Sequence, residues 1–304
     1  MSTWEVLLQQ VVNGLILGSF YALVALGYSM VYGIIKLLNF AHGDIYMIGA
    51  FVCLSVFGLI AGTVAGVPGI IVATLIAMIV SGLLGYLTFR LAYRPLTNIR
   101  APRLSLLITA IGVSLVISNA VLTLTAGRPQ FFTSGIDNSA GRTIGNITIT
   151  YVQMVLLVVS AVLMIGLMLF IGRTMIGKAM RAIAIDPTTC RLMGVNASAI
   201  TSLTFVIGSA LAAVAGGMAC VYYGNVQFNM GFVIGIKAFT AAVIGGIGSI
   251  PGAMVGGLLL GLLEALGTQY VGSQWSDVFA FGLLILILIF RPNGLFGKTE
   301  IERM

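Results

Sequence analysis

The stretch VQMVLLVVSAVLMIGLMLFIG, residues 152–172, runs without a single charged side chain. A helix needs about 20 apolar residues to cross the hydrocarbon core of a bilayer, so this stretch predicts a transmembrane helix. The rest of the chain has the same character, because 59% of its 304 residues are hydrophobic and only 8% are charged. Soluble domains carry about 25% charged residues, which this chain lacks. The sequence therefore predicts an all-α, polytopic membrane protein.

Apolar runs recur along the whole chain and predict a single transmembrane domain over residues 1–304. The candidate spans are 8–35, 44–62, 68–92, 104–126, 152–172, 199–224, 230–247, 251–272 and 275–290. The seventh is short, rich in glycine and interrupted by Lys237, so a full span, a broken helix and a re-entrant segment all remain open. We expect eight or nine crossings, some of them broken or re-entrant.

The distribution of lysine and arginine predicts the orientation, because cytoplasmic loops of membrane proteins are enriched in both. Basic residues gather between spans three and four, between spans five and six, and in the tail. They are Arg90, Arg94, Arg100, Arg103, Arg173, Lys178, Arg181, Arg191, Arg291, Lys298 and Arg303. These segments are expected in the cytoplasm, and the loop 127–150, which contains Arg128, Arg142 and Asp137, is expected outside. The N-terminus would be external with nine crossings and internal with eight. The net charge of +7 thus reflects topology and predicts no nucleic-acid partner.

Glycine pairs four residues apart predict close contacts between helices. They are Gly14/Gly18, Gly58/Gly62, Gly252/Gly256 and Gly257/Gly261. Packing within one bundle is favoured over a dimerisation motif. A weak similarity between the two halves of the chain involves Asn39 and Asn229. Each lies next to a phenylalanine and before a glycine-containing helix.

The cytoplasmic loop 173–198 contains several helix boundary signals. Residues 174–184 predict a short helix that presents Met175, Ala179 and Ala182 on one face. Asp186 is an expected N-cap, with Pro187 at the first position of a second helix and Gly194 at its end. Two capped helices would form a rigid elbow that transmits force from a partner, and an ordinary interfacial helix is the alternative. The neighbouring GRTMIGKA, residues 172–179, lacks the hydroxyl and the preceding strand of a P-loop, so it predicts no phosphate site.

Polar residues at two places in the apolar runs are candidates for the translocation pathway. In Asn39-Phe-Ala-His-Gly-Asp44, Gly43 permits a break near the membrane boundary and Asp44 can cap the next helix. His42 is the only histidine, and a structural role is favoured over a proton relay. The run Gly245–Gly252 predicts a tight or mobile turn, with a gate as the alternative.

Lys237 and Glu264 each lie inside an apolar run, where a lone charge costs roughly 2.5–3.5 kcal/mol. Counted from the outer ends of their spans, the two lie at similar depths. They are therefore predicted to pair or to line a wet cavity together. The alternative is that Lys237 extends alone to the outer surface.

Residue types that support catalysis or metal binding are scarce. Cys53, Cys190 and Cys220 have no CxxC spacing and are expected to be buried, inert thiols. No nucleophile and base occur together, and neither a charge ring nor a carbonyl filter predicts a channel. We expect no catalytic residue, no metal site and no cofactor.

Three long motifs and a short tail segment resemble those of branched-chain amino-acid ABC permeases of the LivH type. LNFAHGDIYMIGA at 38–50 is similar to the family's N-terminal signature, and the segment 177–196 to its ATPase-coupling loop. KAFTAAVIGGIGSIPGA at 237–253 resembles its third signature, and RPNGLFG at 291–297 its tail. The coupling loop departs from the wider importer consensus, because Lys178 lies near the place of a Glu-Ala-Ala start.

The resemblance implies a permease subunit in the bacterial inner (plasma) membrane. Its implied partners are a second homologous permease subunit, two ATP-binding subunits that hold the ATP, a periplasmic solute-binding protein and membrane lipid. The family's usual substrates are leucine, isoleucine and valine, and close relatives carry urea or short amides. An ion-driven secondary transporter and a membrane-embedded enzyme or scaffold are the other readings. The pathway candidates are Asn39, His42, Asp44, Lys237 and Glu264, and the coupling candidates are Gly177, Arg181, Asp186 and Gly194.

Overall fold

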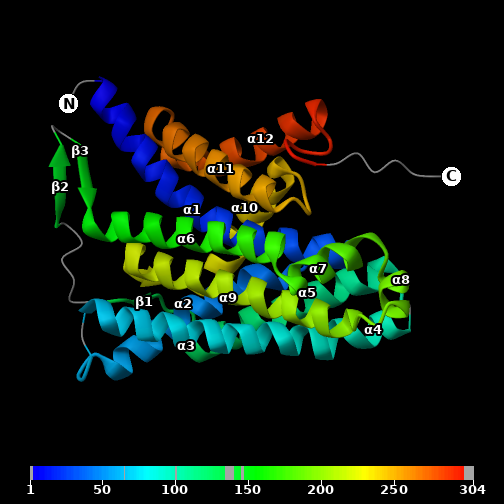
Figure 1. Cartoon of the computed structure of the whole chain (residues 1–304). Helices are drawn as coiled ribbons and strands as arrows, with labels where there is room; N and C mark the ends of the chain where they lie inside the picture. The colour runs from blue at the N-terminus through cyan, green and yellow to red at the C-terminus, as the bar shows by residue number, and fades with distance from the viewer. Residues whose placement is uncertain (1–2, 65, 100, 134–139, 145–146, 298–304) are drawn as a thin grey trace.

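Long apolar helices dominate the structure, a computed structural model that describes residues 3–64, 66–99, 101–133, 140–144 and 147–297. The main helices are α1 (Thr3–Ile35), α2 (Ala41–Ile60), α3 (Gly66–Leu87), α5 (Arg103–Thr125), α6 (Tyr151–Arg173), α9 (Ala197–Tyr223), α10 (Met230–Gly245), α11 (Ile250–Tyr270) and α12 (Ser276–Phe290) (Figure 1). Within the described ranges, eight helices are long and apolar enough to cross a membrane, and α10 is a shorter apolar helix. The predicted polytopic all-α fold is confirmed.

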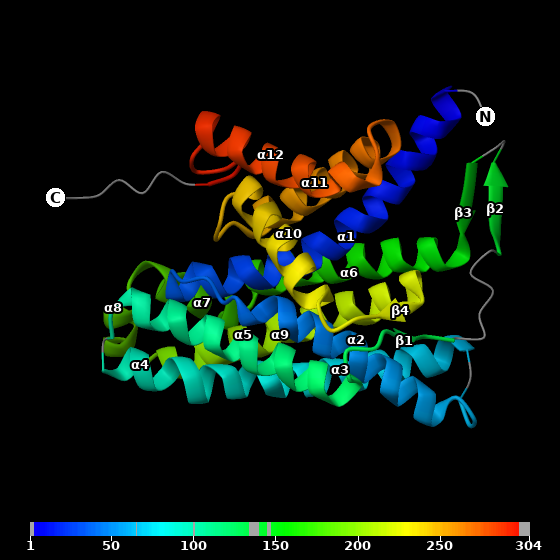
Figure 2. The same ribbon diagram turned by 180° about the vertical axis from the view of Figure 1, so that it is seen from behind.

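The short elements lie at the two ends of the bundle, as both views show (Figures 1 and 2). At one end, the hairpin of β2 (Gly141–Ile144) and β3 (Ile147–Thr150) lies beside the N-terminus of α1. The Gln9 side chain bonds both the amide and the carbonyl of Thr148 there, at 3.0 and 3.1 Å. We call this the hairpin end. The strands β1 (Gln130–Phe131) and β4 (Asn225–Val226) pair antiparallel near the same end.

The opposite end carries α4 (Arg94–Asn98), α7 (Met175–Ile185) and α8 (Pro187–Leu192) (Figure 1). We call it the basic end. Its described arginine and lysine residues are Lys36, Arg90, Arg94, Arg103, Arg173, Lys178, Arg181, Arg191 and Arg291. The loop 127–150 is thus separated from the three basic segments, as predicted. Arg100, Asp137, Lys298 and Arg303 lie outside the described residues.

Two helices begin after a break inside the bundle. The break 36–40 separates α1 from α2, and Lys36 adopts a left-handed conformation there with φ +56°. A second break, 224–229, separates α9 from α10. The first turns of α2 and α10 then touch, because a Cβ added to Gly43 would lie 2.4 Å from the carbonyl oxygen of Gly231. The segment 230–247 thus forms one short continuous helix that begins after a break, and we call α2 and α10 the broken helices.

The two halves of the chain are arranged as an inverted pair. α1 runs from the hairpin end to the basic end, and α9 runs the opposite way (Figure 1). α1 packs on α11 as α9 packs on α3, and α2 contacts α5 as α10 contacts α12. The weak sequence similarity around Asn39 and Asn229 therefore corresponds to related positions in the two halves, because each residue lies just before one of these two helices. Counting α10, the described chain passes between the ends nine times, which places the N-terminus at the hairpin end.

The glycine pairs serve packing inside this bundle. A Cβ on Gly18 would lie 2.8 Å from the Cα of Leu258 in α11, and one on Gly261 would lie 2.2 Å from the amide of Gly18. Such contacts let two helix backbones approach closely. By contrast, a Cβ on Gly58 or Gly62 would meet no described atom within 4 Å. The predicted close packing of helices is therefore confirmed at Gly18 and Gly261. It is not found at Gly58 and Gly62 among the described residues.

Candidate functional site

A polar cavity of about 610 Å³ lies among α1, α9, α10, α11 and α12. Its wall combines amide side chains, such as Asn13, Asn225 and Gln227, with tyrosines. Lys237 and Glu264 also line it, although each residue is only 6% exposed. The arrangement supplies hydrogen-bonding groups and both signs of charge inside an otherwise apolar bundle.

The predicted pairing of Lys237 with Glu264 is confirmed, and the alternative of a lone lysine at the surface is wrong. The Lys237 Nζ lies 2.7 Å from Glu264 Oε1 and 2.9 Å from Asp277 Oδ1. Ser276 accepts from Lys237 at 3.1 Å and donates to Glu264 at 2.5 Å, while the Tyr21 hydroxyl donates to Glu264 Oε2 at 2.8 Å. A buried ion pair is tolerated when such additional hydrogen bonds satisfy its remaining atoms.

The sequence analysis missed Tyr21, Ser276 and Asp277 as members of this cluster. Of these three, only Asp277 could have been found from the sequence, because it is an acidic residue in the first turn of an apolar helix. Its carboxylate is mostly exposed, at 65%, so the lysine joins a buried carboxylate to a solvated one.

Asp44 lies where the two broken helices meet. Its carboxylate accepts hydrogen bonds from Ser114 and from Ser118, the latter at 2.8 Å. A Cβ on Gly231 would lie 3.0 Å from Asp44 Oδ1, so the carboxylate is close to the first turns of both α2 and α10. Negative charge is favourable at helix N-termini because of the helix dipole. The prediction that Asp44 caps the helix is wrong, because α2 already begins at Ala41 and Phe40 occupies the N-cap position.

Asn39 and His42 stabilise the same break. The Tyr93 hydroxyl donates to Asn39 Oδ1 at 3.1 Å. The His42 ring packs edge-on against Tyr28, with 4.9 Å between ring centroids, and fills the space left by Gly27 and Gly208. Gly27 lies eight residues before the end of α1 at Ile35, about 12 Å along its axis. The His42 ring is therefore buried inside the bundle, about two helical turns from the end of α1.

A second cavity, of about 460 Å³, adjoins the start of α10. Its wall is mainly apolar and aromatic, with Phe40, Phe228 and Phe239, and includes the two serines that bond Asp44. Asn229 lines this cavity and the polar one. The break before α10 thus lies between a polar and an apolar compartment.

The loop 173–198 contains the two capped helices that the sequence predicted. Thr174 caps α7 by accepting from the Gly177 amide at 3.0 Å, and Asp186 caps α8 by accepting from the amides of Thr188 and Thr189. Hydrogen bonds from the Thr189 hydroxyl and from these amides hold the pKa of Asp186 below its ordinary value. Gly194 has the left-handed conformation expected after a helix end, with φ +80°.

The face of α7 that packs on the bundle is not the one that carries Met175. The helix buries Gly177, Met180 and Ile183, whereas Met175 is 78% exposed. The reason is the sharp junction with α6, where a Cβ on Gly177 would lie 2.2 Å from the Ile171 carbonyl oxygen. The Arg181 guanidinium donates to that same carbonyl and fixes the angle between α6 and α7.

Apolar spanning helices, two broken helices that meet beside a polar cavity and a capped loop at one end define a membrane permease. A family model described as branched-chain amino acid transport system / permease component matches residues 10–288. The chain belongs to this family.

Three relatives illustrate the extent of the similarity. The chain is 47% identical to the high-affinity branched-chain amino acid transport system permease protein BraD of Pseudomonas aeruginosa over 98% of both chains. It is 43% identical to the corresponding LivH of Escherichia coli, over 98% of this chain and 97% of LivH. The permease protein LivM of Salmonella typhimurium is 30% identical over 49% of this chain and 34% of LivM. No solved structure matches the chain.

Proposed function

We propose that the chain is a membrane-spanning subunit of a binding-protein-dependent importer for leucine, isoleucine and valine. The observation that carries this proposal is the 47% identity, over nearly the whole of both chains, to a relative named as a branched-chain amino acid permease. An importer of urea or short amides is the nearest alternative, and an ion-driven secondary transporter is a more distant one.

The cavities suit a substrate that is charged at one end and apolar at the other. An amino-acid zwitterion carries one ammonium and one carboxylate, and the Lys237–Glu264 pair offers both complementary charges in one wall. The apolar cavity beyond Asn229 matches a branched aliphatic side chain. Asn39, His42 and Asp44 then shape the break next to this path without binding the substrate tightly. Weak contacts suit an importer whose affinity resides in a separate binding protein.

The basic end is suited to contact ATP-binding subunits in the cytoplasm. Gly177, Arg181, Asp186 and Gly194 fix the geometry of the loop through the contacts described above. The loop also leaves large apolar side chains uncovered within this subunit. They are Met175, Ile176, Ile185, Leu192 and Met193. A rigid loop with an apolar surface can transmit a movement of a docked partner to α6 and α9.

The proposed assembly contains a second homologous permease subunit, two ATP-binding subunits that bind the ATP, and a periplasmic solute-binding protein, in a bacterial inner membrane. The name of the partly similar LivM is consistent with two related permease chains in one system. On this proposal the chain itself hydrolyses no ATP and needs no cofactor of its own.

Reconstitution in proteoliposomes tests the proposal. With all partner subunits and ATP, uptake of labelled leucine is expected, and omission of the ATP-binding subunits should abolish it. A protonophore should leave the initial rate unchanged, because no ion gradient is involved. Uptake of urea in place of leucine would identify the alternative substrate class, and uptake without the ATP-binding subunits would contradict the importer mechanism.

A further inference from the structure

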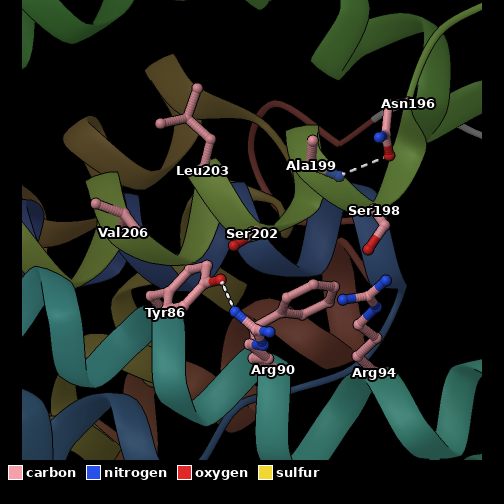
Figure 3. Close-up of a pocket in the computed structure, with 10 residues that line it drawn as sticks. Tyr86, Arg90, Arg94, Asn196, Ser198, Ala199, Ser202, Leu203 and Val206 are labelled. Carbon is pink, nitrogen blue, oxygen red and sulfur yellow. Dashed lines mark hydrogen bonds between the residues drawn. The ribbon is translucent and has the colours of Figure 1, made fainter.

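A third cavity, of about 420 Å³, lies at the basic end between α3, its continuation α4 and the start of α9. None of its lining residues lines the two pathway cavities. Tyr86, Arg90 and Arg94 form one wall, and residues of the first turns of α9 form the other (Figure 3). It therefore has no part in the proposed path of the substrate.

The cavity exists because two tightly packed helices separate at this level. A Cβ on Gly85 would lie 2.1 Å from the Ser209 hydroxyl, so α3 and α9 are in close contact there. Directly after this contact the helix becomes π-helical over Thr88–Tyr93, and Pro95 follows in the first turn of α4. A π-helical turn is rare and frequently marks a functional site.

The cavity is polar at its mouth and apolar at its depth. Because α3 runs toward the basic end and α9 away from it, Arg94 and Ser198 lie near the mouth, whereas Leu203 and Val206 lie deeper. The outer surface of α3 continues the apolar character. Leu83 and Leu87 of α3 and Leu91 of the π-helical segment are exposed at this level.

The two arginines give the mouth an uncompensated positive charge. Arg90 Nη1 donates to the Tyr86 hydroxyl at 2.6 Å, and its guanidinium lies 5.7 Å from the centroid of that ring. Figure 3 shows the Arg94 side chain directed toward Ser198. In the part of the chain that the structure describes, no acidic side chain lines the cavity and neither arginine forms an ion pair.

We propose that this cavity binds the phosphate headgroup of an anionic phospholipid in the leaflet at the basic end. Guanidinium groups bind phosphate with two parallel hydrogen bonds, and the hydroxyls of Ser198 and Ser202 can donate further ones. Basic pockets between membrane helices are typical sites for such headgroups. The acyl chains would lie along the apolar part of the cavity and along Leu83, Leu87 and Leu91. The lipid would thereby connect the π-helical segment to the first turn of α9, directly after the proposed coupling loop.

Native mass spectrometry of the full-length protein in detergent tests the proposal, with phosphatidylglycerol or phosphatidylcholine added. Wild type should retain phosphatidylglycerol and not phosphatidylcholine. The double variant R90Q/R94Q should bind phosphatidylglycerol roughly 25-fold more weakly, since each basic residue near an anionic lipid surface contributes about a factor of five. The matched control R173Q/R291Q removes two exposed arginines of the same end and should bind as wild type does.

A variant that keeps the charge provides an independent measurement. Ser202→Phe fills the cavity, retains both arginines, and should also abolish retention while circular dichroism stays that of wild type. Excess inorganic phosphate should not displace the lipid, because the acyl chains contribute to binding. Equal retention by R90Q/R94Q, or displacement by inorganic phosphate, would overturn the lipid proposal. Hydrogen exchange offers a further test. If residues 86–94 become protected only when the ATP-binding subunits are added, and not when the lipid is added, the lipid proposal is also overturned.

Discussion

Asp44 in the first half and Lys237 in the second are buried charges on the two broken helices, and the structure compensates them differently. In the first half, Asp44 of α2 is bound by two serine hydroxyls of α5 beside two helix N-termini. In the second half, Lys237 of α10 is bound by the carboxylates of Glu264 and of Asp277 in α12. The charge of Asp44 is thus stabilised by hydroxyl and helix dipoles alone, whereas the charge of Lys237 is stabilised by two carboxylates of opposite charge. We infer that the Lys237 cluster depends on each of its charged members, and that the Asp44 site tolerates loss of its charge.

The largest expected effect is that of Lys237→Met. It leaves Glu264 buried without its cation, which typically destabilises a protein by about 3–5 kcal/mol. The thermal unfolding midpoint in detergent and the uptake rate should both fall. The double variant Lys237→Met/Glu264→Gln should recover much of the loss, because Tyr21 or Ser276 can still donate to the neutral amide oxygen while the amide NH2 donates to the other hydroxyl. Additive damage in the double variant would show that the pair is not the stabilising unit.

The second prediction concerns the contact between the two broken helices. Gly43→Ala places a methyl group against the backbone of Gly231, which cannot rotate away, and overpacking of this kind costs about 1–3 kcal/mol. Unfolding midpoint and uptake should both decrease. Gly58→Ala in the same helix is the control, since its Cβ meets no described atom within 4 Å. A Gly43→Ala variant as stable as this control would mean that α2 and α10 are not held together.

Asp44→Asn should have a smaller effect than Lys237→Met. The amide oxygen still accepts a hydrogen bond from Ser114 or Ser118, and the loss is the interaction with the helix dipoles, about 1–2 kcal/mol at a partly buried site. Chemical unfolding followed by circular dichroism measures the difference. If Asp44→Asn destabilises the protein as strongly as Lys237→Met, the proposed contrast between the halves is wrong.

The smallest effect on the bundle is expected from Gly194→Val, because Gly194 lies outside both charged sites. A β-branched residue in the left-handed conformation costs about 1–2 kcal/mol locally. The unfolding midpoint should hardly change, while transport-coupled ATPase activity of the assembled complex should fall. Normal assembly and uptake by this variant would contradict a rigid coupling role for the loop.

Short-range signals predicted local features of the fold correctly. The caps at Asp186 and Gly194 depend only on the next few residues, and the structure has both. The Lys237–Glu264 pair was also predictable, because both depths follow from counting along helices with a fixed rise per residue. The buried face of α7 was not, since it depends on the angle at which α7 leaves α6, and that angle is fixed by the contact of Gly177 with Ile171.

The sequence by itself determined the membrane-spanning character, the positions of the apolar helices and the ends of the short ones. Each of these follows from composition or from residues within a turn or two of helix. Only the tertiary structure decided that Ser114 and Ser118 compensate Asp44, and that α2 and α10 meet at Gly43 and Gly231. Those partners lie far apart in the chain. Which side chains face one another depends on how each helix is rotated about its axis, and each residue changes that direction by about 100°.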